Sequence, residues 1–247
     1  MNDQAISMYE QLHEQLAANI AQVRSNIAQS AQLSGRSPEE ITLIAVSKTV
    51  PIKAVKIAYN LGVTDFGENR VQEALPKIAE FHPQDLRWHM IGHLQSNKAG
   101  KVIGAFDSVQ SVDSLHLAQV LSRHAEEQGK RLPVLLEVNV AGEESKEGMA
   151  PADLPLLARQ ITALPAIEVQ GLMTIAPLVE DLAEVRMVFR SLHNLLERLR
   201  QELPDCKWQH LSMGMTNDYQ VAIEEGATIV RVGRAIFGER NYKGVSR

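Results

Sequence analysis

The chain has 247 residues, of which 45% are hydrophobic and 22% are charged, and its formal net charge at pH 7 is -5. This composition is typical of a soluble globular protein that can bury a large core. The acidic balance supplies no basic field for duplex nucleic acid, so we expect no nucleic-acid partner.

The sequence also predicts a compartment. Its single cysteine, Cys206, cannot form an internal disulfide, and the first residues lack the basic and then apolar pattern of a signal peptide. No apolar stretch approaches the roughly 20 residues needed to span a bilayer. We therefore expect a cytoplasmic protein without a membrane segment, and a monomer, since the sequence gives no sign of an arm or partner domain.

An amphipathic helix opens the chain, over about residues 3–33. Apolar residues recur at three-and-four spacing from Ile6 to Ile27, which is the pattern of a helix with one buried face. After it, strand-like and helix-like runs alternate to the end of the sequence. The clearest helix covers 181–201, and the expected strands cover residues 41–47, 64–66, 86–91, 106–109, 134–140, 168–173, 208–211 and 228–232.

Eight strand-then-helix units imply parallel strands joined by right-handed crossovers. Their number and the chain length predict an α/β fold, a single (β/α)8 TIM-type barrel over about residues 41–240. With the opening helix it would form one domain over residues 1–247. The alternative is an open doubly wound sheet, but no G-x-G-x-x-G turn follows the first strand.

Lys48 directly follows the first expected strand. An amine at the end of a buried strand is either paired or deprotonated and reactive, because burial disfavours an ammonium group. A deprotonated amine can form an imine with an aldehyde. The alternative is a lysine that simply extends its charge to the surface.

The last two expected strands are followed by loops suited to an anion. Residues 212–216 precede a short helical run, and the unpaired amides at a helix start favour a phosphate. Gly214 would allow close backbone approach, and Gly233 can offer a second amide from the loop after the eighth strand. The alternative is simple capping of the helix by Thr216 or Asn217, with Gly233 only a turn.

Arg231 lies within the eighth expected strand, where a permanent cation among apolar neighbours needs an acceptor. A carboxylate of the protein would serve, and so would a ring nitrogen of a bound heterocycle. One ligand satisfies Lys48, the two loops and Arg231 together, namely a phosphorylated pyridine aldehyde.

Other chemistries fit less well. His89 and His93 stand four residues apart, but the first lies in an expected strand and the second in a loop, so we expect no metal site. His210 occupies the position where a hydrolase nucleophile elbow around Ser212 needs its first glycine. The charged loop at residues 143–148 is given no role.

Six long motifs occur in order between about residues 40 and 240, and motifs of this length are very specific. They are Ala45-Val-Ser-Lys-Thr, Phe66-Gly-Glu-Asn-Arg-Val-Gln-Glu, Trp88-His-Met-Ile-Gly-His-Leu-Gln-Ser-Asn-Lys, Glu137-Val-Asn-Val-Ala-Gly-Glu-Glu-Ser-Lys-Glu-Gly, Gly171-Leu-Met-Thr-Ile and Leu211-Ser-Met-Gly-Met-Thr-Asn-Asp-Tyr. By these motifs the chain resembles the pyridoxal phosphate homeostasis proteins, the YggS family.

The resemblance implies a single-domain barrel similar to the amino-terminal domain of alanine racemase, which binds pyridoxal 5'-phosphate (PLP) in the type III fold. It implies that Lys48 carries PLP as a Schiff base, that Arg231 faces the pyridine nitrogen and that Asn69 borders the ring. Ser212, Gly214, Thr216 and Gly233 fall at the phosphate positions, where the family often has serine in place of Thr216. The expected cofactor-binding residues are therefore Lys48, Asn69, Met173, Ser212, Met213, Gly214, Thr216, Arg231 and Gly233.

The family is known as a carrier and regulator of the PLP pool, without established turnover. An arginine cannot give a proton to the ring nitrogen, so the ring should be a poor electron sink. Alanine racemase takes a second base, a tyrosine, from a separate carboxyl-terminal domain, and we expect no room for one after residue 242. We therefore expect no catalytic residues, and partners among PLP-dependent apo-enzymes or vitamin B6 salvage enzymes. The alternatives are an amino-acid racemase or decarboxylase of the alanine racemase class, and a cofactor-free aldolase that forms an imine through Lys48.

Overall fold

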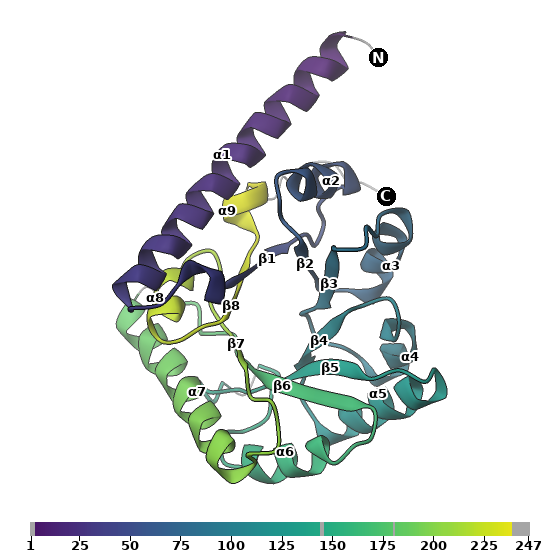
Figure 1. Cartoon of the computed structure of the whole chain (residues 1–247), viewed down its shortest axis with the longest axis vertical. Coiled ribbons are helices and arrows are strands. Elements are labelled where there is room, and N and C mark those ends of the chain that lie inside the picture. Colours follow the sequence, from purple (N-terminus) through teal and green to yellow (C-terminus); the bar gives the residue numbers. More distant parts are fainter. Residues whose placement is uncertain (1–2, 144–145, 180, 239–247) are drawn as a thin grey trace.

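The computed structural model describes residues 3–143, 146–179 and 181–238. In this part of the chain eight parallel strands close into a barrel in sequential order, and helices surround it (Figure 1). The strands are β1 (Thr42–Val46), β2 (Asp65–Glu68), β3 (Arg87–Met90), β4 (Ser108–Val112), β5 (Leu132–Glu137), β6 (Ile167–Met173), β7 (His210–Ser212) and β8 (Ile229–Val232). The predicted (β/α)8 barrel is confirmed, and the alternative of an open sheet is wrong.

Helix α1 (Asp3–Leu33) lies along one side of the barrel against α2, α8 and α9, and its amino-terminal end projects beyond the barrel (Figure 1). Its buried face includes Leu16, Ile20, Val23 and Ile27, as the three-and-four spacing predicts. The other helices are α2 (Ile52–Asn60), α3 (Val71–Glu80), α4 (Ala99–Val102), α5 (Leu115–Glu127), α6 (Leu154–Thr162), α7 (Leu182–Glu202), α8 (Tyr219–Glu224) and α9 (Arg234–Phe237), with short 3-10 helices η1 (Pro38–Glu40) and η2 (Ser96–Lys98). Among the described helices, none is both long and apolar enough to cross a membrane.

The barrel interior holds a small apolar cluster that is separate from the main core between strands and helices. Its members are Ile44, Leu135, Met173 and Ile229. Because successive side chains of a strand point to opposite faces, residues two positions further along share the inward direction. Glu137 and Arg231 stand two positions after Leu135 and Ile229, so both charged side chains point into the barrel above this cluster.

Another part of the interior is polar. His89 Nε2 lies 2.8 Å from Asp65 Oδ1, and His89 Nδ1 lies 2.7 Å from Ser108 Oγ. Burial would raise the pKa of Asp65, but hydrogen bonds from His89 and Arg87 outweigh it and hold that pKa below its ordinary value. His89 therefore belongs to the barrel interior, whereas His93 Nδ1 contacts a different carboxylate, so the two histidines form no pair.

The strand ends differ from the prediction at two places that matter for the site. Strand β4 continues to Val112, beyond the predicted end at residue 109, and its pairing with β5 is irregular between Val109 and Val112. Strand β5 ends at Glu137, before the predicted end at residue 140. Glu144 of the charged loop and residues 239–242 lie outside the described residues.

Leu135→Ala tests the packing of the interior cluster. Leu135 is 2% exposed, and its truncation should lower the free energy of unfolding by about 2–5 kcal/mol, because buried methyl groups are lost and a cavity remains. Leu156→Ala, on α6 where the side chain is 64% exposed, is the matched control and should stay within about 0.5 kcal/mol of the parent. Urea unfolding measures both, and equal losses would contradict the placement of Leu135.

Candidate functional site

A cavity of about 600 Å³ lies at the carboxyl ends of β1, β7 and β8. Its lining includes Lys48, Thr216, Asn217, Arg231, Gly233 and Arg234. The lysine, the two loops and the buried arginine that the sequence singles out therefore meet in one place. This is the end of a (β/α)8 barrel where functional residues gather.

Lys48 lies in a tight turn that follows β1. The Ser47 amide donates to the Gly67 carbonyl at 2.9 Å, and the Val50 amide donates to the Ser47 carbonyl at 2.9 Å. Thr49 has φ 64°, in the left-handed region that β-branched residues rarely adopt. Such a conformation costs about 1–3 kcal/mol and is typical of functional sites. The Lys48 side chain is partly buried and lines the cavity.

A buried ion pair fixes the end of β1 from the outer side of the barrel. Lys77 Nζ, on α3, donates to the Ser47 carbonyl at 2.7 Å and to Glu68 Oε1 at 2.8 Å. Ser47 Oγ donates to the same Glu68 oxygen at 2.7 Å. The Glu68 side chain is fully buried, and the network holds the backbone immediately before Lys48.

Arg231 is 4% exposed inside the barrel. Its Nη1 donates to Ser212 Oγ at 2.6 Å and its Nη2 donates to the Thr174 carbonyl at 2.8 Å. Within the described part of the chain these are the only hydrogen bonds of its guanidinium, and no carboxylate there forms an ion pair with it, so some of its five side-chain N–H donors are unused. Burial lowers the pKa of Arg231 to about 10, opposed by the charges of Glu137 and Asp218.

Ser212 orients Arg231 and is not among the described residues that line the cavity. It is fully buried, accepts the bond from Arg231 and donates to Gln110 Oε1 at 2.7 Å. The sequence reasoning missed Gln110, because the predicted fourth strand stopped one residue before it. The available signal was a polar residue two positions after Ser108, on the same inward face of β4.

Four residues of the cavity lining have backbone N–H groups that donate to no acceptor in the described chain. They are Thr216, Asn217, Gly233 and Arg234. Backbone N–H groups need hydrogen-bond partners, so several uncommitted amides in one cavity suit a multi-oxygen anion. The N-cap residue of α8 is Asp218, without a side-chain cap bond. Capping by Thr216 or Asn217, the alternative reading of this loop, is therefore not observed among the described residues.

Gly214 allows the loop after β7 to pack closely against α8. Its φ is +91°, and a Cβ atom there would lie 2.6 Å from Ala222 Cβ and 2.8 Å from Tyr219 Cα. The missing side chain therefore lets the loop pack against α8. The expectation that it also allows close backbone approach to a ligand stays a prediction.

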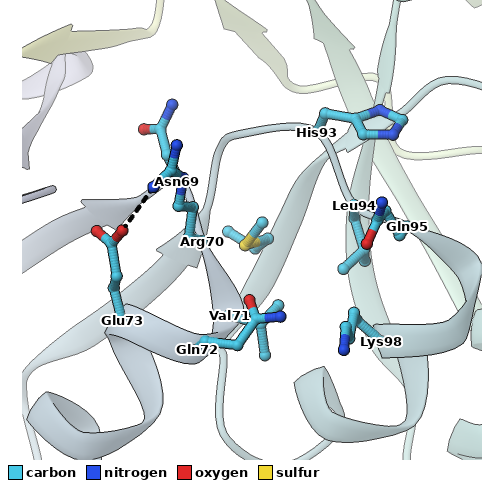
Figure 2. Close-up of a pocket in the computed structure, with 10 residues that line it drawn as sticks. Asn69, Arg70, Val71, Gln72, Glu73, His93, Leu94, Gln95 and Lys98 are labelled. Atoms are coloured by element: carbon cyan, nitrogen blue, oxygen red, sulfur yellow. Dashed lines mark hydrogen bonds and ion pairs between the residues drawn. The ribbon is translucent and has the colours of Figure 1, made fainter.

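Three more residues expected at the cofactor are absent from the described lining of this cavity. Met173 is fully buried in the interior cluster, and Met213 is fully buried in the outer core. Asn69 lines a separate cavity of about 450 Å³ between the start of α3 and the loop after β3 (Figure 2). Its Oδ1 atom is buried and has no hydrogen-bond partner in the described chain.

Glu137 is a second group that the sequence reasoning did not assign to the site. It is 6% exposed, and its carboxylate makes no hydrogen bond with any described residue. Desolvation raises the pKa of Glu137 to about 7; Arg231 lowers it, and Asp113 and Glu147 raise it further. The available signal was a charged residue at an inward position that ends the apolar run of β5.

A family model described as the alanine racemase N-terminal domain matches residues 18–241. Alanine racemase from Clostridium difficile has the same barrel, with a TM-score of 0.70 at 16% sequence identity over 95% of this chain and 59% of that one. The family match and the shared barrel therefore place the chain in the class of alanine racemase N-terminal domains.

Relatives with higher sequence identity define the family within this class. The chain is 46% identical over 227 residues to a pyridoxal phosphate homeostasis protein of Pseudomonas aeruginosa, covering 92% of this chain and 96% of the relative. It is 43% identical to that of Pasteurella multocida, covering 91% and 97%. PipY of Synechococcus elongatus, solved with PLP bound, has a TM-score of 0.81 at 41% identity, covering 91% and 100%. The chain belongs to the pyridoxal phosphate homeostasis protein family, which confirms the resemblance seen in the motifs.

Glu137→Gln should remove a pH dependence of stability. A carboxyl whose pKa is about 7 in the folded protein and 4.5 ordinarily binds its proton more tightly when folded. Its contribution to the free energy of unfolding therefore falls as pH rises from 4.5 to 7 and is constant above that range. The fall is roughly 3 kcal/mol, and the glutamine variant should lack it.

Urea unfolding between pH 4.5 and pH 8, with a metal chelator present, measures this effect. The control is Glu127→Gln, at an exposed glutamate of α5, which should follow the parent curve. Parallel curves for the parent and Glu137→Gln would contradict the buried, unpaired state of this carboxyl.

Proposed function

We propose that this protein binds PLP, holds it as a Schiff base on Lys48, and takes part in intracellular PLP homeostasis. The observation that carries the proposal is the convergence in one cavity of an amine, four uncommitted amides and a buried guanidinium with unused donors. The amine suits the aldehyde, the amides suit the phosphate, and the guanidinium suits the ring nitrogen. Family membership and the PLP-bound PipY structure support it.

In this proposal each expected residue has a definite part. The amides of Thr216 and Gly233, with those of Asn217 and Arg234, bind the phosphate, and Arg231 donates to the pyridine nitrogen. The remaining residues act around them: Ser212 orients the guanidinium, Gly214 and Met213 shape and anchor the phosphate loop, Met173 packs below the ring, and Asn69 borders it.

We further propose that the protein stores and passes on PLP without turning over a substrate of its own. PLP, when bound, supplies an electrophilic carbonyl and an electron-withdrawing ring. Arg231 cannot give a proton to the ring nitrogen, so the ring withdraws electrons weakly. The ionisable side chains in the described lining are Lys48, Asp218, Arg231 and Arg234, and this set lacks the tyrosine or histidine that would serve as a second acid or base.

The proposed recipients and donors are PLP-dependent apo-enzymes or vitamin B6 salvage enzymes. We place the protein in the cytoplasm as a monomer and treat the chain as one PLP-binding domain. The lone cysteine, which cannot form an internal disulfide, supports the cytoplasmic assignment.

One observation favours a second candidate function. Glu137 is a buried carboxyl whose pKa lies near neutrality and whose charge interacts with Arg231. Such a group is suited to proton transfer at a substrate carbon. The second candidate is therefore an amino-acid racemase or decarboxylase of the alanine racemase class.

Lys48→Ala tests the attachment of PLP. The parent protein, mixed with PLP, should show visible absorption from the Schiff base, and borohydride should fix the adduct as a mass increase on the intact chain. Lys48→Ala should lose both signals, because the amine is gone. Lys53→Ala is the matched control, since Lys53 lies one turn away over the ring of Tyr9, and should keep both. An undiminished adduct in Lys48→Ala would contradict the proposal, and a protein that takes up no PLP would favour the aldolase alternative.

Hydrogen exchange at the α-carbon of amino acids separates storage from turnover. With a panel of amino acids in heavy water, the PLP-loaded protein should exchange the α-proton no faster than free PLP, because the ring nitrogen stays neutral. Glu137→Gln should behave the same. Exchange at several turnovers per minute that Glu137→Gln abolishes would instead establish the racemase-like candidate.

A further inference from the structure

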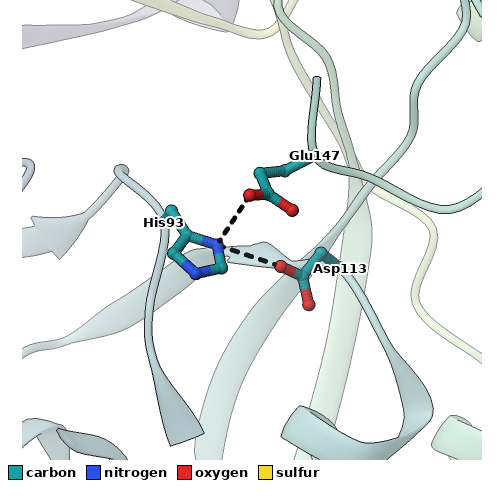
Figure 3. A group of neighbouring side chains, drawn as sticks. All are labelled: His93, Asp113 and Glu147. Atoms are coloured by element: carbon teal, nitrogen blue, oxygen red, sulfur yellow. Dashed lines mark ion pairs between the residues drawn. The ribbon is translucent and has the colours of Figure 1, made fainter. Parts of the chain in front are cut away.

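A second group of titratable side chains lies at the mouth of the barrel, after β3, β4 and β5 (Figure 3). His93 Nδ1 lies 3.2 Å from Asp113 Oδ2 and 3.8 Å from Glu147 Oε1. One ligand atom from each of the three residues lies within 4.8 Å of the other two. Figure 3 shows an oxygen of each carboxylate directed at the same ring nitrogen of His93. None of the three is among the described residues that line the Lys48 cavity.

Glu137 gives an independent indication that something is missing from this group. Its side chain points into the barrel and is 6% exposed, and its carboxylate has no hydrogen-bond donor in the described ranges. Its charge is repelled by Asp113 and Glu147 and attracted by His93. A buried carboxylate without a donor is costly, and this one stands within electrostatic reach of two further carboxylates.

The described residues supply too little positive charge for this group. Asp113 and Glu147 both contact the single imidazole of His93, which can neutralise at most one of them, and the charge of Glu137 interacts with both carboxylates. Arg231, which attracts Glu137, forms no ion pair with it within the described chain and spends two donors on Ser212 and Thr174. A bound cation would offset the repulsion that remains.

We propose that His93, Asp113 and Glu147 bind a divalent metal ion at the barrel mouth, with Glu137 as a buried counter-charge. One imidazole nitrogen and two carboxylate oxygens form a donor set that Zn²⁺ and Mn²⁺ accept, with water completing the coordination. The three ligands lie in the segments that follow three successive strands, β3, β4 and β5. The proposal stands on these residues alone and does not rest on the PLP assignment.

Titration of the full chain with Mn²⁺, without PLP, tests the site. Electron paramagnetic resonance of free Mn²⁺ and calorimetry should show saturable binding of one ion per chain. His93→Ala, Asp113→Asn and Glu147→Gln should each weaken binding at least about 10-fold, since even the loss of an outer partner of a metal ligand costs that much. Glu137→Gln should weaken it by a smaller factor, because it removes charge but no ligand atom.

His124→Ala is the matched control. His124 Nδ1 lies 2.9 Å from Glu127 Oε2 on α5, which is a similar exposed pair without a third ligand, and its loss should leave Mn²⁺ binding unchanged. Circular dichroism confirms that each variant folds. The proposal is overturned if the parent binds neither Mn²⁺ nor Zn²⁺ saturably, or if the ligand variants bind as the parent does. It is also overturned if free lysine displaces Mn²⁺ at equal concentration, which would make this a site for a protonated amine.

Discussion

A guanidinium buried inside a parallel barrel is the constraint on which this site depends. Removing a permanent cation from water costs several kcal/mol, and the fold compensates only in part. Ser212 and the Thr174 carbonyl each accept one bond from Arg231, and Gln110 fixes Ser212 from the opposite wall. Residues of β4, β7 and β8 and the segment after β6 are thereby tied to one side chain. The donors that Arg231 keeps unused make a neutral heterocyclic nitrogen a fitting partner.

The other two parts of the site, Lys48 and the cavity-lining amides, are positioned by the main chain. Lys48 is presented by a turn that contains the strained Thr49, and Lys77 and Glu68 brace that turn from outside. In the proposed phosphate site, the loop after β7 is held in place by the packing of Gly214 on α8. In the proposed binding mode, attachment and phosphate binding would rely on rigid elements, and the ring would meet a partner that cannot protonate it. Such an arrangement of rigid attachment points and a non-protonating arginine favours tight binding of PLP over catalysis by PLP.

The sequence was enough to predict the barrel, because eight alternating apolar runs leave few other topologies. It also singled out Lys48, Arg231 and the last two loops, since each follows or interrupts a buried strand. It could not predict what depends on exact strand ends or on contacts far apart in sequence. Gln110 was missed because β4 extends past its apolar part, and its bond to Ser212 joins residues 102 positions apart. Whether Gly214 faces a ligand or a helix is likewise decided only by packing.

The central claim concerns the state of the PLP ring nitrogen beside Arg231. The most direct measurement is the ¹⁵N NMR chemical shift of PLP labelled at that nitrogen and bound to the protein. The account predicts the shift of an unprotonated pyridine nitrogen that accepts a hydrogen bond, changed in Arg231→Gln. The shift of a protonated pyridinium, or a shift that Arg231→Gln leaves unchanged, would contradict it.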